Sequence, residues 1–339
     1  MQTPEGGPPH RSPDVPPVGT RVVVRHRLPV PDPLSGATLT DVVGVLAHSD
    51  AEHLLVRTRR GEVAVPRASV TVVKELPPAP SRRGAPHLAL SVEDLQRVMV
   101  GAWPPVESEH LGDWLLRAAG GFTQRANSVM SAGDPGRSLD AAVDAVEAWY
   151  DARGITPALT LAGPVGFALA GDPLGALLLA RGYLPRVTTT TFTAAAATVA
   201  AQGPAPSPDV EVSLGRGLTD EWFAAYQGYR EAPPGPARAV LTGSPEQVFA
   251  TARDADGVLG VGRLGIAATW GGIAAMWTAP QARRRGIARA LLTRLAGEAH
   301  ARGVRSLHLQ TDTDNAAAQA FYRSAGFVPH HEYVTLRRP

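Results

Sequence analysis

The segment from Pro280 to Leu292 constrains the fold of this chain more than any other stretch. It contains three consecutive arginines, Arg283–Arg285, then Gly286, and then apolar residues at helical spacing. The first turn of a helix presents backbone N–H groups without intrahelical partners, and a glycine lets an anion approach that backbone closely. We therefore predict a loop that opens a helix and binds phosphate, with guanidinium groups supplying further charge.

Strand patterns flank this loop on both sides. Residues 257–270 and 273–279 are largely apolar and are separated by Gly271 and Gly272, which predicts a hairpin closed by a two-glycine turn. Beyond the loop, apolar residues continue at helical spacing, and Val304–Gln310 has the pattern of a further strand. The predicted unit is a strand, a phosphate loop, a helix and a strand.

Two motifs in this region resemble those of one enzyme superfamily. The spacing Arg283-x-x-Gly286-x-Ala288 resembles the acetyl-CoA loop of the GNAT superfamily of N-acetyltransferases. Asn315 precedes Tyr322 by two helical turns, and a Gly-Phe pair follows, which resembles the superfamily's closing segment. The resemblance covers about residues 209–339 and implies acetyl-CoA as cosubstrate and direct acetyl transfer to an amine.

The resemblance also implies roles for individual residues. A neutral amine attacks the thioester, and Tyr322 acts as the general acid that protonates the departing CoA thiolate. A strand like Ala275–Ala279 splays from its neighbour, and its backbone binds the pantetheine arm and polarises the thioester carbonyl. The residues expected to contact acetyl-CoA are Met276, Thr278, Arg283, Arg284, Arg285, Gly286, Ile287, Ala288, Arg289 and Asn315.

The whole chain is predicted to have an α/β (α+β) fold with two GNAT-like mixed-sheet half-domains preceded by a small SH3-like β-barrel. The barrel is indicated by five short strand patterns, and the first half-domain looks like a faded copy of the second. Proline-rich stretches at 77–86 and 197–208 are predicted to be linkers. The expected segments are a disordered N-terminus (1–17), the barrel (18–76), the degenerate GNAT-like domain (88–196) and the catalytic GNAT domain (209–339).

The faded copy lacks the features expected to bind acetyl-CoA. Its loop at 133–137 carries Asp134 and Pro135 instead of an arginine cluster, and Leu178 stands where Tyr322 stands. An acidic, proline-bearing loop is a poor cradle for pyrophosphate. We therefore expect the first half to serve architecture and the second half to perform the chemistry.

Composition narrows the setting of the protein. The chain has no cysteine, which excludes disulfides and thiolate metal ligands, and no metal site is expected. It shows neither a long apolar run nor a signal peptide, so we expect a cytoplasmic protein without membrane contact. The formal net charge is only +2, which makes nucleic acid an improbable partner.

The acceptor is the least determined part of the prediction. A small-molecule amine is favoured over a protein lysine, because the second half-domain could restrict access to the site. An aromatic stripe lies between Leu218 and Gln247 and offers one edge to the acceptor; it consists of Trp222, Phe223, Tyr226 and Tyr229. Candidates for a general base, by residue type alone, are Asp220, Glu221, His308, Asp312, His330 and His331.

One alternative function stays open at this point. The chain could be a non-catalytic, acyl-CoA-binding regulatory protein whose barrel binds a partner or a nucleic acid through its arginines. The retained Tyr322 argues against this reading, because a regulator needs phosphate contacts but no acid for the thiolate. The sequence also leaves open whether the chain acts as a monomer or as a homodimer.

Overall fold

The structure is a computed structural model that describes residues 15–58, 61–75, 85–203 and 209–339. The chain divides into two compact units, of which the smaller contains the N-terminal strands and the segment Phe167–Ala176. Most of the N-terminus expected to be disordered, and parts of both expected linkers, lie outside the described residues. Among the described residues, no helix is both long enough and apolar enough to cross a membrane.

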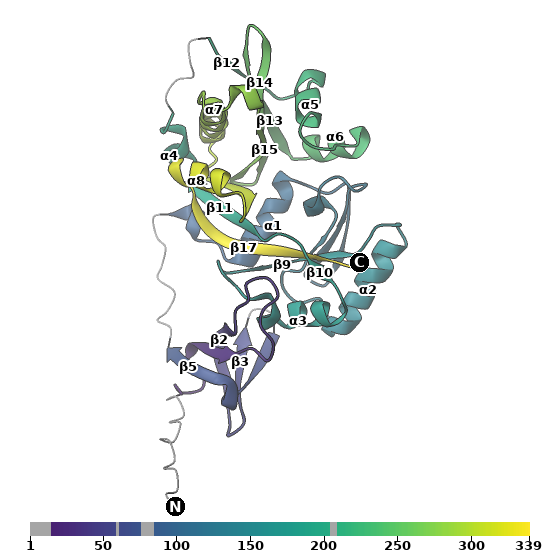
Figure 1. Ribbon diagram of the computed structural model, residues 1–339, viewed down its shortest axis with the longest axis vertical. Coiled ribbons are helices and arrows are strands. Elements are labelled where there is room, and N and C mark those ends of the chain that lie inside the picture. Colours follow the sequence, from purple (N-terminus) through teal and green to yellow (C-terminus); the bar gives the residue numbers. More distant parts are fainter. Residues whose placement is uncertain (1–14, 59–60, 76–84, 204–208) are drawn as a thin grey trace, which may run out of the picture. The chain divides into compact units, whose positions relative to one another are not determined.

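The smaller unit is an antiparallel sheet whose five strands match the five predicted ones (Figure 1). The strands pair in the order β4-β3-β2-β1-β5, and alternating residues such as Val22, Val24 and Leu46 form its core. The described strands leave β4 and β5 as edges, so the sheet is open where a closed barrel was expected. The strands are β1 (Arg21–Arg27), β2 (Leu39–Ser49), β3 (His53–Thr58), β4 (Gly61–Pro66) and β5 (Val70–Glu75).

Arginines of this sheet are already matched with acidic side chains. Arg25 pairs with Asp41 on the neighbouring strand at 2.8 Å, and Arg57 pairs with Glu62 at 3.2 Å. These ion pairs offset the positive charge of both arginines, whereas a nucleic acid would need a continuous patch of positive charge.

The larger unit is built on one twelve-stranded mixed sheet. Its main path runs β12-β13-β14-β15-β16-β11-β17-β9-β8-β7-β6, and β10 pairs with β17. The strands are β6 (Glu107–Leu111), β7 (Trp114–Ala118), β8 (Val129–Met130), β9 (Ala158–Gly163), β10 (Leu184–Pro185), β11 (Thr189–Ala195), β12 (Glu211–Gly215), β13 (Glu246–Asp254), β14 (Gly257–Ala267), β15 (Trp270–Thr278), β16 (Ser306–Asp312) and β17 (Val328–Arg337). The helices of the chain are α1 (Val92–Ala102), α2 (Leu139–Asp151), α3 (Pro173–Ala180), α4 (Ala196–Ala200), α5 (Asp220–Gln227), α6 (Pro234–Thr242), α7 (Ile287–Ala301) and α8 (Ala316–Ser324).

The two predicted halves exchange strands within this sheet. Strand β11, the last strand of the first half, lies between β16 and β17 of the second half. Strand β17, which ends the second half, pairs in turn with β9 and β10 of the first half. The hydrogen-bonded ladder therefore crosses the boundary between the halves, and each half completes the sheet of the other.

Each half repeats one supersecondary plan. Strands β8 and β9 are parallel and are joined through α2, and strands β15 and β16 are parallel and are joined through α7. A parallel pair requires such a crossover connection, usually a helix. The matching crossovers agree with the interpretation that one half is a faded copy of the other.

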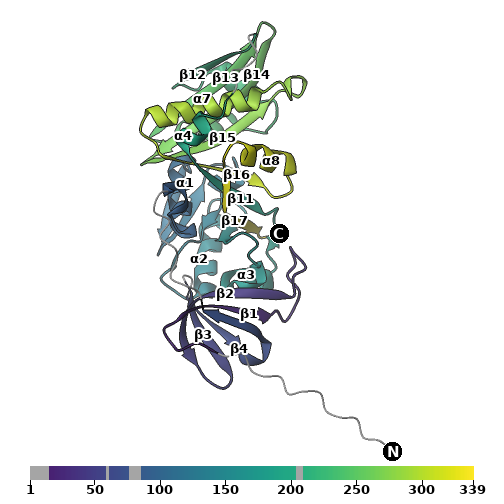
Figure 2. The ribbon, with the colours of Figure 1, turned by 90° about the vertical axis from the view of Figure 1, so that its left-hand side faces the viewer.

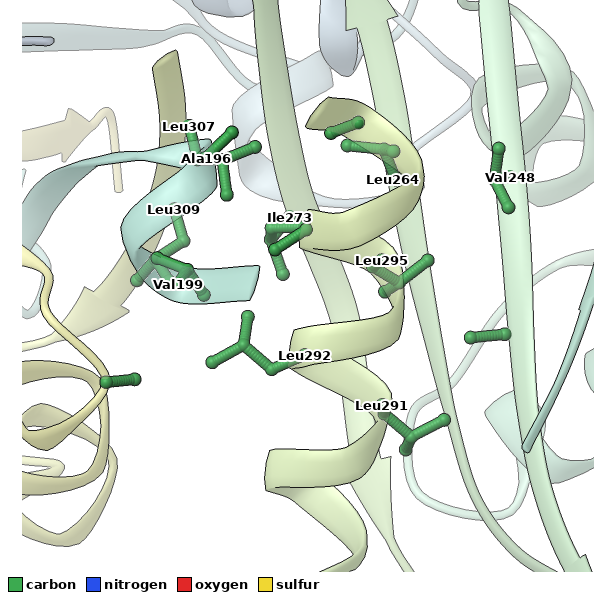
Figure 3. Packing of buried hydrophobic residues seen from close by; sticks show 14 of the residues in the cluster. Ala196, Val199, Val248, Leu264, Ile273, Leu291, Leu292, Leu295, Leu307 and Leu309 are labelled. Carbon is green, nitrogen blue, oxygen red and sulfur yellow. The ribbon is translucent and has the colours of Figure 1, made fainter. Parts of the chain in front are cut away.

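Helices cover the second half of the sheet on both faces (Figures 1 and 2). Leucines of α7 pack against the strands of this half and against α4. Figure 3 shows Leu292 and Leu295 near Ile273, with Leu291 one turn further along the helix. On the opposite face, α5 and α6 bury a second apolar cluster that includes Trp222 and Val240. Helix α4 occupies the start of the segment predicted to be a linker, because its Val199 is buried in the first cluster.

The two-glycine hairpin turn predicted at Gly271 and Gly272 is wrong. Both residues lie inside β15, and the turn falls at Ala268 and Thr269 instead. A Cβ on Gly271 would lie 2.8 Å from a side-chain carbon of Leu264, and one on Gly272 would lie 2.5 Å from the Cβ of Ala102. These glycines are required for close packing across the sheet, and local pattern alone does not distinguish that role from a turn.

The sequence also predicts a strand over residues 125–130, and this prediction is largely wrong. The chain forms a 3-10 turn at Gln124–Ala126, and only Val129 and Met130 belong to a strand. The side chain of Asn127 holds the preceding loop, because its Oδ1 accepts from the backbone N–H of Ala119 at 2.8 Å and of Gly121 at 3.1 Å. That loop carries Arg125.

Candidate functional site

Strands β15 and β16 separate beside the predicted phosphate loop. In the described part of the chain they pair only from Trp270–Gly272 to Ser306–His308, and the rest of each strand runs on without the other. A bulge opposite Val261 and Arg263 and a positive φ of 53° at Ala275 accompany this divergence. The edge of β15 that faces β16 therefore has backbone groups available from Ala274 to Thr278, which overlaps the segment Ala275–Ala279 that is predicted to bind the pantetheine arm and polarise the thioester carbonyl.

The phosphate loop leads directly from β15 into α7. Gly286 forms the N-cap of α7 with a φ of +80°, a conformation that favours glycine, and Arg284 has a φ of 63°. Among the described side chains none caps this helix terminus. The first N–H groups of α7 are thus left for an exogenous anion, at the positive end of the helix dipole.

The arginines of the loop have different surroundings. Arg283 and Arg284 are exposed. The Arg285 guanidinium pairs with Asp209 at 2.9 Å and with Asp254 at 3.3 Å. Arg289 donates to the Ser324 hydroxyl at 2.6 Å and lies over the ring of Phe321. The charge free to meet a phosphate comes mainly from Arg283 and Arg284, while Arg289 joins α7 to α8.

The remaining predicted contacts divide into backbone and side-chain positions. Ile287 is buried in the core, so only its N–H faces the loop, whereas Ala288 is half-buried on the first turn. Met276 and Thr278 are half-buried on the diverging part of β15. The Asn315 carboxamide oxygen accepts from the N–H of Ala318 at 3.1 Å and caps α8, which leaves the amide NH2 group for a ligand.

Tyr322 lies on α8 and packs against the same apolar cluster as Met276 and Trp277 of β15. Its ring meets Phe327 edge-on, with centroids 6.0 Å apart. Within the described residues, no hydrogen bond occupies its hydroxyl. Burial raises the pKa of Tyr322 to about 12, so the phenol carries its proton throughout the neutral range.

The aromatic stripe predicted near the acceptor is mainly core. Trp222, Phe223 and Tyr226 are buried, while the exposed Tyr229 stacks on Trp277 of β15 with centroids 5.7 Å apart. Burial raises the pKa of Tyr229, and the nearby Tyr226 and Tyr322 raise it as well. Tyr229 is therefore the edge of the stripe that lies beside the diverging strand and near Tyr322.

Sequence reasoning missed Arg125, which comes from the first half of the chain. Its guanidinium donates to the Oε1 of Gln310 on β16 and lies over the ring of Trp103, 5.1 Å from the centroid. No local signal could have identified it, because its partner on β16 is 185 residues away in the chain. The half expected to serve architecture thus places a cationic side chain on a diverging strand.

The corresponding loop of the first half is closed against anions. Ser138 caps α2 by accepting from the N–H of Ala141 at 3.4 Å, and the Asp134 carboxylate accepts from the N–H of Gly136 at 2.8 Å. The N-terminus of α2 is thus capped by Ser138, and the acidic Asp134 lies in the loop just before it. Only α7 combines an uncapped terminus with free arginines among the two crossover helices.

Four of the six candidates for a general base are either paired with arginines or buried. Asp220 pairs with Arg238 and Glu221 with Arg253 on the surface. His308 and His331 are buried, and burial lowers the pKa of each to about 3, with neighbouring histidines adding to the shift at His331. In the described part of the chain, both ring nitrogens of His308 lack a hydrogen-bond partner. These two imidazoles are neutral at physiological pH.

The two buried histidines should make the fold acid-sensitive. Their folded pKa lies below the unfolded value of about 6.5, so the unfolded chain takes up protons first and stability falls as pH drops below 6.5 toward 3. At pH 5 each histidine should cost about 2 kcal/mol of unfolding free energy. Urea denaturation at pH 7 and pH 5 measures the loss. His308→Gln should reduce it by one histidine's share, whereas exposed His300→Gln should leave it unchanged; an equal loss in both variants would contradict the assignment.

Comparison with known proteins agrees with this arrangement. A family model described as "Probable histone acetyltransferase Rv0428c C-terminal" matches residues 91–336, and one described as "Rv0428c N-terminal Sm-like domain" matches residues 16–74. The probable histone acetyltransferase Rv0428c of Mycobacterium tuberculosis is 32% identical over 161 residues, which are 46% of this chain and 49% of that relative. The alignment thus spans about half the length of that curated relative.

Solved structures confirm the fold. A GCN5-related N-acetyltransferase from Kribbella flavida superposes with a TM-score of 0.56 at 14% identity, covering 73% of this chain and 95% of the other. A tandem GNAT protein from the clavulanic acid biosynthesis pathway gives a TM-score of 0.50 at 15% identity, covering 76% and 90%. The predicted GNAT fold is therefore confirmed, and the match at 16–74 agrees with a small N-terminal β domain.

Proposed function

Because the chain belongs to the family of the probable histone acetyltransferase Rv0428c and has the GNAT fold, we propose that it transfers an acetyl group from acetyl-CoA to a primary amine. The observation that carries the proposal is the N-terminus of α7, which is uncapped and adjoins exposed Arg283 and Arg284. The equivalent terminus of α2 is capped by Ser138. This contrast marks α7 as the phosphate-binding terminus.

The residues present fit the shape of acetyl-CoA. The pyrophosphate would lie on the N–H groups from Gly286 to Ala288, with Arg283 and Arg284 supplying charge-assisted hydrogen bonds. The pantetheine arm would lie along the diverging edge of β15, near Met276 and Thr278, and would meet the Asn315 amide. Acetyl-CoA, when bound, supplies the activated acetyl group.

Tyr322 is proposed as the general acid. It has the two properties that the role needs, since it is protonated at neutral pH and its hydroxyl is unoccupied among the described residues. Backbone N–H groups of the diverging β15 edge would stabilise negative charge that develops on the thioester oxygen. The proton of the acceptor amine would leave to solvent, because His308 and His331 are buried and their lowered pKa makes both of them weak bases.

A small-molecule acceptor is favoured over a protein lysine. Arg125 of the first half reaches Gln310 on β16, beside the strand end proposed to hold the thioester, and we expect the first half to narrow access for an acceptor there. The sheet that the two halves share makes this arrangement a permanent part of the unit.

The proposal is tested with the full-length chain, acetyl-CoA and a panel of primary amines, with release of the CoA thiol as the readout. Thiol release that depends on both the chain and an amine is the expected result. Isothermal calorimetry with acetyl-CoA alone provides an independent check. A chain that fails to bind acetyl-CoA would refute the proposal.

A further inference from the structure

A cluster of positive charge lies beside the diverging strands β15 and β16. We call the side chains of Arg125, Arg230, Tyr226 and Gln310 the arginine cluster. Arg125 donates to Gln310, and Arg230 lies close enough to Tyr226 to interact with its hydroxyl. The positive charge of Arg230 also lowers the pKa of Arg125, so the two guanidinium groups are close enough to repel each other. The four side chains come from β16, from the α5 region and from the loop before β8.

The position of Arg125 is built into the fold. Its loop is held by Asn127, whose Nδ2 donates to the carbonyls of Phe122 and Thr123 at 2.8 Å each. Thr123 adopts a φ of 56°, which is costly for a β-branched residue, and its hydroxyl accepts from the indole N–H of Trp103 at 3.0 Å. Backbone strain that the surrounding hydrogen bonds hold in place is common at functional sites, which motivates the search for a function of the half-buried Arg125.

The two arginines of the cluster form no ion pair in the part of the chain that the structure describes. Elsewhere, half-buried arginines such as Arg181 and Arg302 make ion pairs with carboxylates at 2.6–2.9 Å. Among the residues that the structure describes, neither Arg125 nor Arg230 has a carboxylate within ion-pair distance. Asp312 is the carboxylate that attracts Arg125 most directly, but its Oδ1 accepts from the Thr189 hydroxyl and it forms no ion pair with Arg125.

The fully buried Arg263 adds positive charge near the arginine cluster, but it cannot contact a ligand itself. It also lies over the ring of Trp103, 5.4 Å from the ring centroid, and donates to the carbonyls of Leu241 and Ala102 at 2.7 Å each. Its donors are satisfied by neutral acceptors, so its charge is left to act on its surroundings. An anion near Arg125 would relieve the repulsion among these guanidinium groups.

The cluster lies close to the proposed reaction centre. The ring of Tyr226 packs edge-on against the ring of Tyr229, with centroids 5.2 Å apart. Tyr229 in turn stacks on Trp277 of β15, and the nearby Tyr322 raises the pKa of Tyr229. This row connects the arginines with the thioester end of the site. A molecule held at the arginines could therefore present an amine toward the acetyl group.

We propose that Arg125 and Arg230 bind a carboxylate of the acceptor, so that the substrate is a small primary amine that carries a carboxylate, as an amino acid does. A guanidinium matches a carboxylate with two parallel hydrogen bonds, which gives both charge and orientation. A lysine-rich peptide is the opposite case, since it would be repelled by the cluster. The inference rests on the proposed acetyl transfer and specifies its acceptor.

The test compares matched pairs of acceptors with the full-length chain. Each pair consists of an amino acid and the amine left by removing its carboxylate, such as lysine with cadaverine and phenylalanine with phenethylamine, and a lysine-rich peptide is added. We expect kcat/KM to be at least about tenfold higher for the carboxylate-bearing members, the effect of one charge-assisted hydrogen bond. In Arg125→Gln this preference should vanish, while exposed Arg294→Gln on α7 should keep it.

Calorimetry with acetyl-CoA separates this inference from the proposed function. Arg125→Gln should bind acetyl-CoA like the parent chain, which also shows that the variant is folded. Equal rates within each pair, a preference for the peptide, a preference that survives Arg125→Gln, or no transfer to any carboxylate-bearing amine would each overturn the inference while acetyl-CoA binding stands. Absence of acetyl-CoA binding by the parent chain would overturn the proposed function itself.

Discussion

Replacing Arg284 by Glu and Gly286 by Asp in one chain is expected to lower its affinity for acetyl-CoA by more than about 100-fold. Three loop arginines are exposed, and Arg285 among them is paired with Asp209 and Asp254. Arg284→Glu removes one of the other two guanidinium groups and puts an anion in its place. Gly286→Asp places a second carboxylate at the uncapped start of α7, where the phosphates would lie. Titration calorimetry with acetyl-CoA measures the loss.

A matched control lies two turns further along the same helix. Arg294→Glu with Gly297→Asp changes the charge of α7 by the same amount, and a Cβ on Gly297 meets no atom within 4 Å. This control should bind acetyl-CoA with nearly the parent affinity, since the effect of the helix terminus is confined to the first turn. Circular dichroism of both double variants shows whether they are folded. Equal affinity in the folded loop variant and the parent would place the phosphates elsewhere.

Tyr322→Phe is expected to lower turnover by about 100-fold and leave the affinity for acetyl-CoA nearly unchanged. The substitution removes only the hydroxyl, and the ring can keep its edge-on contact with Phe327. Without the phenol, the thiolate has to leave unprotonated or take its proton from water. Calorimetry gives the affinity, and thiol release under saturating acetyl-CoA gives kcat.

A second phenol serves as the control for this experiment. Tyr183 belongs to the first half, and its hydroxyl donates to Glu147 at 2.8 Å. Tyr183→Phe therefore removes a phenol hydroxyl far along the shared sheet from β15 and should leave kcat unaltered. A parent-like kcat in Tyr322→Phe would exclude Tyr322 as the acid, and a similar loss in both variants would point to a general effect on the fold.

Local patterns predicted much of the second half correctly. The loop at Arg283–Gly286 and the helix that follows depend on neighbouring residues alone, because glycine conformation and helix periodicity act over a few positions. The same local reasoning failed at Gly271 and Gly272. Leu264, Ala102 and other residues across the sheet leave no room for a side chain at these two positions. Turn statistics carry no information about such contacts.

For the five N-terminal strands, too, local pattern predicted the positions of the strands but not whether the sheet closes. Alternation of valines and leucines was enough to locate β1 to β5. Whether the first and last strands of such a sheet meet depends on its twist and bend, which no local pattern encodes. The open path of the described strands was therefore visible only in the structure.

The sequence by itself determined where the loop proposed to bind acetyl-CoA, Asn315 and Tyr322 lie, because each motif occupies consecutive turns of one helix or the loop that opens it. Only the tertiary structure decided that β11 and β17 are exchanged between the halves, and that Arg125 meets Gln310 across 185 positions of the chain. The physical reason is that helix caps and glycine turns are short-range, whereas strand pairing and side-chain contacts between halves form only when distant segments pack together.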